Sequence, residues 1–207
     1  GVNHCSDVNL AKEMILAAKE SGANAVKFQT FNAESFITPN TPKVKYQEKT
    51  TSPKETHYEM IKSLELSKDK HQILFDFCEN QKIKFLSTPY NTDSAKFLNK
   101  MGCDAFKTAS ADIVDLNLHS YLAKTGKTVI ISTGMANLEE IKDCVEIYRN
   151  NSNTNFILLH CVSNYPCSDQ SLNMLVLPKL ASTFNCLVGY SGKIINKQHL
   201  SENIVSR

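Results

Sequence analysis

The sequence predicts an α/β fold built on parallel strands and, among such folds, a (β/α)8 barrel. Short apolar runs alternate along the chain with amphipathic helical patterns, as in a parallel sheet covered by helices. Polar residues recur at the C-terminal end of strand after strand, which is where the active sites of barrels form. The same alternation also allows an open doubly wound sheet, and the recurring polar strand ends favour the barrel.

The predicted strands have continuous rather than alternating apolar residues, as expected of parallel strands that are covered on both faces. They are residues 24–31, 83–90, 103–110, 128–135, 155–163 and 186–191. A helical pattern comes before the first of these runs, and a barrel requires another strand before that helix. We therefore expect residues 1–207 to form one partial barrel domain that lacks most of the first barrel strand and all of the eighth.

The predicted helices follow from apolar positions that recur every three or four residues. They are residues 7–21, 67–81, 92–101, 116–125, 138–150 and 171–184. Ser67 is a good N-cap, and Gly102 and Gly126 stand where helices end on a residue that tolerates positive φ. The long polar connection 32–66, with three prolines, is predicted to cover the substrate.

Two helices have a defined apolar face and four histidines have an expected setting. Helix 7–21 is predicted to bury Ala11, Met14, Ile15 and Ala18, and helix 67–81 to bury Ile73, Leu74, Phe77 and Cys78. We expect His57, His71 and His119 to be solvated and His4, with Asn3, to reach the barrel mouth. His160 is either a metal or acid–base residue or a hydrogen-bonded interior histidine.

The composition is that of an ordinary globular chain. Of the 207 residues, 42% are hydrophobic and 21% charged, and the net charge of +2 gives no basic footprint for nucleic acid. No apolar run approaches the roughly 18 residues that span a bilayer. The seven cysteines are odd in number and contain no CxxC pair, which indicates reduced thiols in a cytoplasmic protein.

Lys27 and Lys107 are the sharpest chemical feature, because each lies inside an apolar strand. Burying an ammonium is costly unless an anion pairs with it, so two such lysines at a barrel mouth predict an anion site. The hydroxyls of Thr88, Ser110 and Ser132 and the backbone around Gly134 would supply the hydrogen bonds that a phosphate requires. The alternatives are a snorkelling or carboxylate-paired lysine and a Schiff-base nucleophile.

Further polar residues follow the same strands. Gln29 and Tyr165 are candidate contacts to a sugar, and Asp112, Ser163 and Ser191 complete the strand-end inventory. Taken in order, these strand ends resemble the N-acetylneuraminate (sialic acid) synthase family. The matching stretches are GVNHCSD, GANAVKFQTF, HYEMIKSLELS, FLSTPY, AFKTAS, VIISTGMANLEEI, LLHCVSNYP and VGYS.

The resemblance implies condensation of phosphoenolpyruvate with an N-acetylmannosamine-type sugar, giving a nine-carbon 2-keto sugar acid (sialic or legionaminic acid) and phosphate. It implies that Lys27 and Lys107, with Asp112, are catalytic. The implied phosphoenolpyruvate contacts also include Thr88, Ser110, Ser132 and Ser191, and the implied sugar side includes Gln29, Ser163 and Tyr165.

The chain departs from the family at several points. It reads SAD at 110–112 where bacterial members commonly have SGE, and Lys193 stands where the family has a metal-binding histidine. The family uses Mn²⁺ or Mg²⁺, and we expect both metal histidines, like the C-terminal antifreeze-like domain, to be missing here. The family also forms a homodimer. From the net charge and the short apolar runs we expect neither a nucleic-acid nor a membrane partner.

Three functional interpretations follow from these residues. The first is a truncated copy of a sialic or legionaminic acid synthase, marginally stable and with little activity alone, because missing strands leave open edges. The second is a catalytically inactive chain that binds only an anion or a partner subunit. The third, another phosphoenolpyruvate-condensing barrel, is disfavoured by the HYEMIKSLELS and VSNYP stretches.

Overall fold

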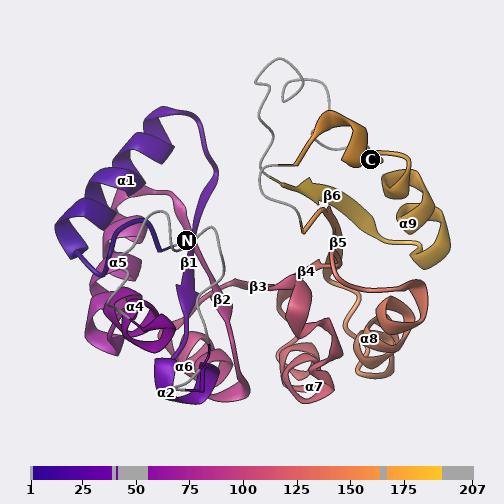
Figure 1. The fold of residues 1–207 in the computed structure, drawn as a ribbon, viewed down its shortest axis with the longest axis horizontal. Helices are drawn as coiled ribbons and strands as arrows, with labels where there is room; N and C mark the ends of the chain where they lie inside the picture. Colours follow the sequence, from indigo (N-terminus) through magenta and orange to yellow (C-terminus); the bar gives the residue numbers. More distant parts are fainter. Residues whose placement is uncertain (1, 39–40, 42–55, 164–166, 193–207) are drawn as a thin grey trace. The chain divides into compact units, whose positions relative to one another are not determined.

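The computed structural model describes residues 2–38, 41, 56–163 and 167–192 (Figure 1). The chain divides into two compact units, residues 1–103 and 104–207. The first contains, in order, α1 (Val8–Glu20), β1 (Ala25–Thr30), α2 (Ala33–Phe36), α4 (His57–Leu64), α5 (Lys68–Gln81), β2 (Lys84–Pro89) and α6 (Thr92–Met101). The second contains β3 (Ala105–Thr108), η1 (Ser110–Val114), α7 (Leu116–Lys124), β4 (Thr128–Ser132), α8 (Leu138–Asn150), β5 (Phe156–Cys161), η2 (Asp169–Ser171), α9 (Val176–Phe184) and β6 (Leu187–Ser191).

All the strands pair in parallel, as predicted. In the first unit β1 pairs with β2, and Lys27 lies opposite Leu86. In the second unit β3, β4, β5 and β6 pair in that order. Each pair is joined through a helix, which is the connection that parallel strands require. The expectation of parallel strands alternating with helices is confirmed, and each strand is shorter than its predicted run by one to four residues in total.

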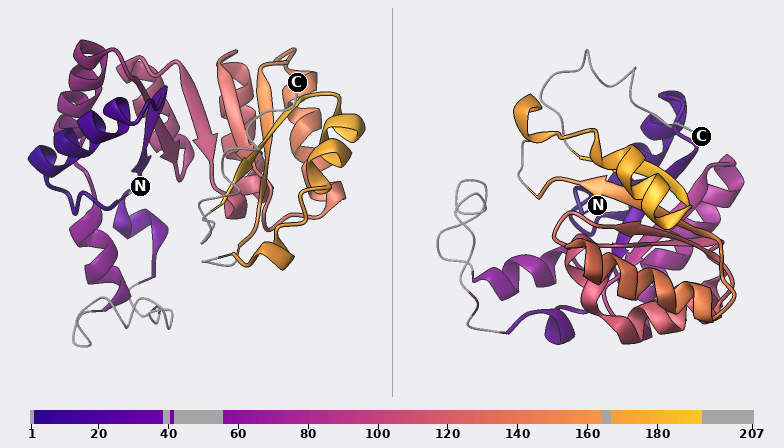
Figure 2. Two further views of the ribbon diagram at one scale, coloured as in Figure 1. Left: turned by 90° about the horizontal axis from the view of Figure 1, so that it is seen from above. Right: turned by 90° about the vertical axis from the view of Figure 1, so that its right-hand side faces the viewer.

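The core of the second unit lies between these strands and its helices (Figure 2). Phe106, Ile131, Leu158 and Val188 occupy alternate positions on one face of the strands, and all are at most 6% exposed. Helix α9 packs on β5 and β6, and α8 packs on α7. Because side chains alternate along a strand, the residues next to these must lie on the opposite face.

Local sequence signals explain most of the helix boundaries. The Ser67 hydroxyl accepts a hydrogen bond from the Lys70 amide at 3.3 Å, as an N-cap should. Asn137 and Glu140 form a capping box at the start of α8. Gly102 ends α6 with φ 103°, a conformation that strains any residue with a Cβ.

Helix α9 is shorter than predicted, because it begins at Val176 rather than at Ser171. Ser171 ends the short helix η2 instead, and Asn173 has φ 42°, a left-handed conformation that interrupts a right-handed helix. The long polar connection 32–66 contains α2 and α4 in its described part. Residues 39–40 and 42–55 of it lie outside the described residues, and the role of the whole connection as a substrate cover stays a prediction.

Two predicted burial patterns are partly wrong. Ala11, Ile15, Leu74 and Cys78 are buried as expected, but Met14 is 41% and Ile73 is 45% exposed. His71 and His119 were expected to be solvated, yet they are 1% and 0% exposed. Each is held by a partner on another element, Thr30 for His71 and Tyr148 for His119. Both ring nitrogens of His71 have partners, whereas His119 is paired at Nδ1 and its buried Nε2 has no partner among the described residues.

Two chemical expectations can be compared with the described residues. All seven cysteines are thiols rather than halves of disulfides, as predicted. Among the helices that the structure describes, none combines the length and the apolar character needed to cross a membrane.

Candidate functional site

The polar strand ends of the second unit share the sheet face opposite its core. Lys107 alternates with Phe106 and Thr108, both of which are 0% exposed on the helix side. Following the pairing register, Ser132 at the end of β4 lies on the same face as Lys107. Ser191 at the end of β6 pairs with Cys161, and both fall on that face too. The predicted grouping of Lys107, Ser132 and Ser191 is therefore present in this unit.

Lys107 is held by hydrogen bonds but has no carboxylate partner among the described ion pairs. Its Nζ donates to the Ser132 hydroxyl and to the Thr108 carbonyl at 3.2 Å. Burial lowers the pKa of Lys107, and the opposing effects of Cys161 and Asp112 only partly offset this. An ammonium that is partly desolvated and incompletely neutralised stabilises a bound anion, which supports the anion interpretation over the paired-lysine alternative.

A second group of hydrogen bonds surrounds Gly134, just after β4. The Gly134 amide donates to the Ser110 hydroxyl at 3.1 Å, and the Ser163 hydroxyl donates to the Gly134 carbonyl at 3.0 Å. Ser110 uses a lone pair in this bond, which does not engage its own O–H. The Gly134 amide therefore donates to Ser110 in this structure, and donation to a phosphate by the backbone around Gly134 stays a prediction.

Gly134 is also required by the space around it. A Cβ at this position would lie 2.7 Å from the Cys161 Cβ and 2.8 Å from the Cys161 carbonyl oxygen. Contacts this short force the backbone to shift. The close approach holds the loop after β4 against the end of β5, and this fixes where Ser110 and Ser163 meet it.

Asp112 lies in η1, directly after β3. Its Oδ2 accepts a hydrogen bond from the Ala109 amide at 3.2 Å. Burial raises the pKa of Asp112 to about 6, with a smaller increase from Asp115, against lowering by the Ala109 amide and Lys107. A carboxyl group with a pKa near neutrality can both accept and donate a proton at working pH, as acid–base chemistry requires.

The first unit carries Lys27, Gln29 and Thr88 on one face of β1 and β2. Lys27 and Gln29 are alternate residues of β1, and Thr88 lies opposite Gln29 in the register. The Gln29 amide donates from Nε2 to the Tyr90 hydroxyl at 3.0 Å. Thr88 is 2% exposed. The structure therefore brings together the three predicted residues of this unit, and it adds Tyr90, which the sequence did not single out.

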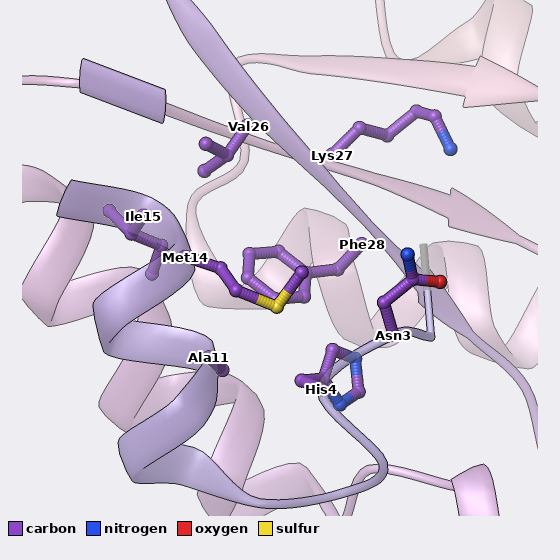
Figure 3. A pocket seen from close by; sticks show the side chains of 8 residues that line it. All are labelled: Asn3, His4, Ala11, Met14, Ile15, Val26, Lys27 and Phe28. Carbon is purple, nitrogen blue, oxygen red and sulfur yellow. The ribbon is translucent and has the colours of Figure 1, made fainter. Parts of the chain in front are cut away.

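A pocket of about 240 Å³ between α1 and β1 lies beside these residues (Figure 3). It is lined mainly by apolar side chains such as Met14 and Phe28, and Figure 3 shows the Lys27 side chain extending away from them. His4 is 3% exposed and its ring lies 5.7 Å from that of Phe28, on the face opposite Lys27. The expectation that His4 joins the polar strand ends is therefore wrong.

His160 is an interior histidine. It is 8% exposed, and its Nε2 lies 2.7 Å from the Leu172 carbonyl, which can only accept. Nε2 therefore carries a proton and is not available to a metal. The described residues contain no group of three or more His, Cys, Asp or Glu side chains that could hold a metal ion. Tyr165 and Lys193 lie outside the described residues.

Sequence reasoning missed Tyr90 and Cys161. Tyr90 ends the FLSTPY stretch, one residue after β2, so its position was visible although its partner was not. Cys161 looks like a small hydrophobe in the sequence, yet it lies on the Lys107 face and affects the pKa of that lysine. The position of a cysteine at a strand end, among hydroxyl residues, was the available signal.

Comparison with known proteins places these residues in context. The NeuB family matches residues 14–200. The N,N'-diacetyllegionaminic acid synthase of Legionella pneumophila is 42% identical over an alignment of 195 residues, which covers 92% of this chain and 55% of that protein. The enzyme of the same name from Campylobacter jejuni is 40% identical over 92% of this chain and 58% of its own length. The chain thus spans a little over half the length of these relatives.

A solved structure shows the same fold. The N-acetylneuraminic acid (sialic acid) synthetase of Leptospira borgpetersenii matches with a TM-score of 0.83 and 32% identity, over 94% of this chain and 63% of that one. The truncated 3-deoxy-D-arabino-heptulosonate 7-phosphate synthase of Thermotoga maritima, at 12% identity and a TM-score of 0.62, shares the fold.

Proposed function

Because this chain belongs to the NeuB family, we propose that it carries the phosphoenolpyruvate-binding part of a sialic or legionaminic acid synthase. The single observation behind this proposal is the environment of Lys107. A partly desolvated ammonium, bonded to the Ser132 hydroxyl, faces the same side of the sheet as Ser191. Cations and preorganised hydroxyl donors are what a ligand with both a phosphate and a carboxylate requires.

In this proposal the reaction joins phosphoenolpyruvate to the open-chain aldehyde of an N-acetylmannosamine-type sugar. The methylene carbon of phosphoenolpyruvate attacks the aldehyde carbon, water adds to the other alkene carbon, and cleavage of the C–O bond releases phosphate. Lys107 stabilises the anionic groups of phosphoenolpyruvate and Ser132 orients the Lys107 ammonium. Lys27 and Thr88 are proposed phosphoenolpyruvate contacts on the strength of the sequence resemblance.

We assign Asp112 to proton transfer and three further residues to binding of the sugar. With a pKa of about 6, Asp112 is suited to exchange a proton with the aldehyde oxygen that becomes a hydroxyl. Gln29, Ser163 and Tyr165 are proposed sugar contacts. The favoured product is a legionaminic acid, since the relatives of 42% and 40% identity are N,N'-diacetyllegionaminic acid synthases.

The described residues do not fit a divalent metal, because none of their clusters could hold one. The steps proposed here are therefore assigned to side chains alone, and Mn²⁺ or Mg²⁺ enters only as an addition to the assay. We further propose that the six strands belong to an incomplete (β/α)8 barrel acting in the cytoplasm, and that the protein works as a homodimer.

The same observation favours a second candidate, a chain that binds phosphoenolpyruvate without turning it over. One experiment separates the two. Phosphoenolpyruvate is titrated into the chain by calorimetry in EDTA, and phosphate release is then measured with Mn²⁺ after adding N-acetylmannosamine or, in a parallel assay, the diacetamido sugar that a legionaminic acid product requires. Binding with sustained release supports the synthase, and binding without release supports the second candidate. Absence of binding contradicts both.

A further inference from the structure

A chain of buried hydrogen bonds connects β1, β2 and α5 within the first unit. His71 Nε2 lies 2.9 Å from the Thr30 hydroxyl, and that hydroxyl lies 2.7 Å from the hydroxyl of Ser87. On the other side of the ring, Nδ1 lies 3.0 Å from the Ser67 carbonyl oxygen. His71, Thr30 and Ser87 are all at most 7% exposed.

The donor and the acceptor of each of these hydrogen bonds follow from which groups carry a hydrogen. The Ser67 carbonyl can only accept, so Nδ1 must carry the proton of the ring. In the neutral imidazole Nε2 is then an acceptor, and the Thr30 hydroxyl must donate to it. Having used its only hydrogen, Thr30 must accept from the Ser87 hydroxyl. Burial lowers the pKa of His71 despite the nearby carbonyls of Ser67, Gln29 and Leu66, which keeps the ring neutral.

This series of hydrogen bonds through His71, Thr30 and Ser87, called the relay below, lies next to two of the proposed ligand contacts. Thr30 follows Gln29 in β1, and Ser87 precedes Thr88 in β2. The Thr30 carbonyl also accepts from the Tyr90 amide at 3.1 Å, while Tyr90 accepts from Gln29 on the opposite face. The two strand ends are thus joined on both faces of the sheet.

We infer that His71, acting through Thr30, is a positioning residue that sets where Gln29 and Thr88 stand for ligand binding. The inference rests on the proposed function. His71 touches neither the sugar nor the phosphoenolpyruvate. Its role is to fix the side-chain direction of Thr30 and Ser87, so that the next residue of each strand is held on the ligand face.

Four substitutions separate the parts of the relay. Thr30→Val keeps the shape of the side chain and removes its hydroxyl, whereas Thr30→Ser keeps the hydroxyl. His71→Gln replaces the Nε2 acceptor with an amide oxygen, and His71→Asn supplies only the donor toward Ser67. The matched control is Tyr148→Phe in the second unit, which also removes a buried hydroxyl 2.9 Å from a histidine nitrogen.

The first readout is NMR of the chain without ligand. The imidazole ¹⁵N shifts of His71 are expected to show a neutral ring protonated on Nδ1. Thr30→Val and His71→Asn are expected to shift the backbone amide signals of Gln29 and Thr88, and Thr30→Ser and His71→Gln to restore them. A proton on Nε2 would overturn the inference. So would Thr30→Val spectra in which the amide signals of Gln29 and Thr88 shift no more than they do in Tyr148→Phe.

The second readout is the affinity for phosphoenolpyruvate. Thr30→Val is expected to weaken binding by about tenfold, and Thr30→Ser and His71→Gln to stay within about threefold of the parent. An equal loss in Thr30→Val and Tyr148→Phe would mean a general effect of stability and would overturn the inference. If the parent chain does not bind phosphoenolpyruvate, the proposed function fails, and the NMR results alone decide whether the relay positions Gln29 and Thr88.

Discussion

Replacing Lys107 with methionine should weaken ligand binding and leave the stability of the fold nearly unchanged or higher. The ammonium is partly buried and its pKa is lowered, so the fold is less stable with the charge than with an apolar side chain of similar length. The substitution Lys107→Met would leave the Ser132 hydroxyl without this donor, which costs about 1 kcal/mol, and would relieve the desolvation of the ammonium, which acts in the opposite direction. The free energy of unfolding should therefore change by no more than about 1 kcal/mol, or rise.

The loss of affinity for phosphoenolpyruvate should be larger. A hydrogen bond to a charged group contributes about 1.5–3 kcal/mol, so Lys107→Met should weaken binding by roughly 10- to 100-fold. Calorimetric titration gives the affinity, and urea unfolding gives the stability of the same samples. Lys124→Met is the control, since it removes the same charge from an exposed position on α7. A Lys107→Met chain that binds as tightly as the parent, or that unfolds more easily by several kcal/mol, would refute the reasoning.

Three further substitutions test the structure. Asp112→Asn should raise the free energy of unfolding at pH 7.5 by about 1 kcal/mol, after allowance for the partial exposure of the side chain. Burial raises the pKa of Asp112 to about 6, so above that pH the folded chain carries a charged form that destabilises it. Urea unfolding at pH 7.5 and pH 4 checks this, and a larger gain at pH 4 would contradict it. His119→Asn should flatten the pH dependence of stability, because burial lowers the pKa of His119 to about 4. Below about pH 6.5 the unfolded chain binds a proton that the folded chain does not bind until about pH 4. The free energy of unfolding of the parent therefore falls by up to about 3 kcal/mol between pH 6.5 and pH 4. An unchanged difference in stability between pH 7 and pH 4.5 would count against this. Gly134→Ala should destabilise the fold by about 1–3 kcal/mol and shift the NMR signals of Ser110 and Ser163, because its Cβ would lie 2.7 Å from the Cys161 Cβ. If Gly134→Ala unfolds thermally at the same temperature as the parent, the loop after β4 can shift without cost, which contradicts this prediction.

Much of the fold could be predicted because its signals are local. The run TVII at residues 128–131 is β-branched throughout, as is typical of a buried parallel strand, and it makes up most of β4. Ser67 and Gly102 determine helix ends through bonds or dihedral angles within a few residues. Where a boundary depended on tertiary contacts the prediction was wrong, as at α9, where Asn173 adopts positive φ and His160 holds the preceding carbonyl.

Residue type alone located part of the candidate site. A lysine within an apolar strand predicts an anion site, which stays a prediction, and the structure shows that Lys107 is partly desolvated and bonded to Ser132. The settings of His71 and His119 could not be read in the same way, because each depends on a hydroxyl from a distant part of the chain. Without knowledge of that partner, a histidine on an amphipathic helix is predicted to be exposed to solvent. The relay through Thr30 therefore becomes visible only in three dimensions.

A crystal structure of the chain with phosphoenolpyruvate would test the central claim most directly. The account predicts the phosphate or carboxylate of the ligand within hydrogen-bonding distance of Lys107 Nζ, with Ser110 or Ser191 donating to it. Phosphoenolpyruvate bound away from the face that Lys107 shares with Ser132, at a concentration that saturates the chain in solution, would contradict it.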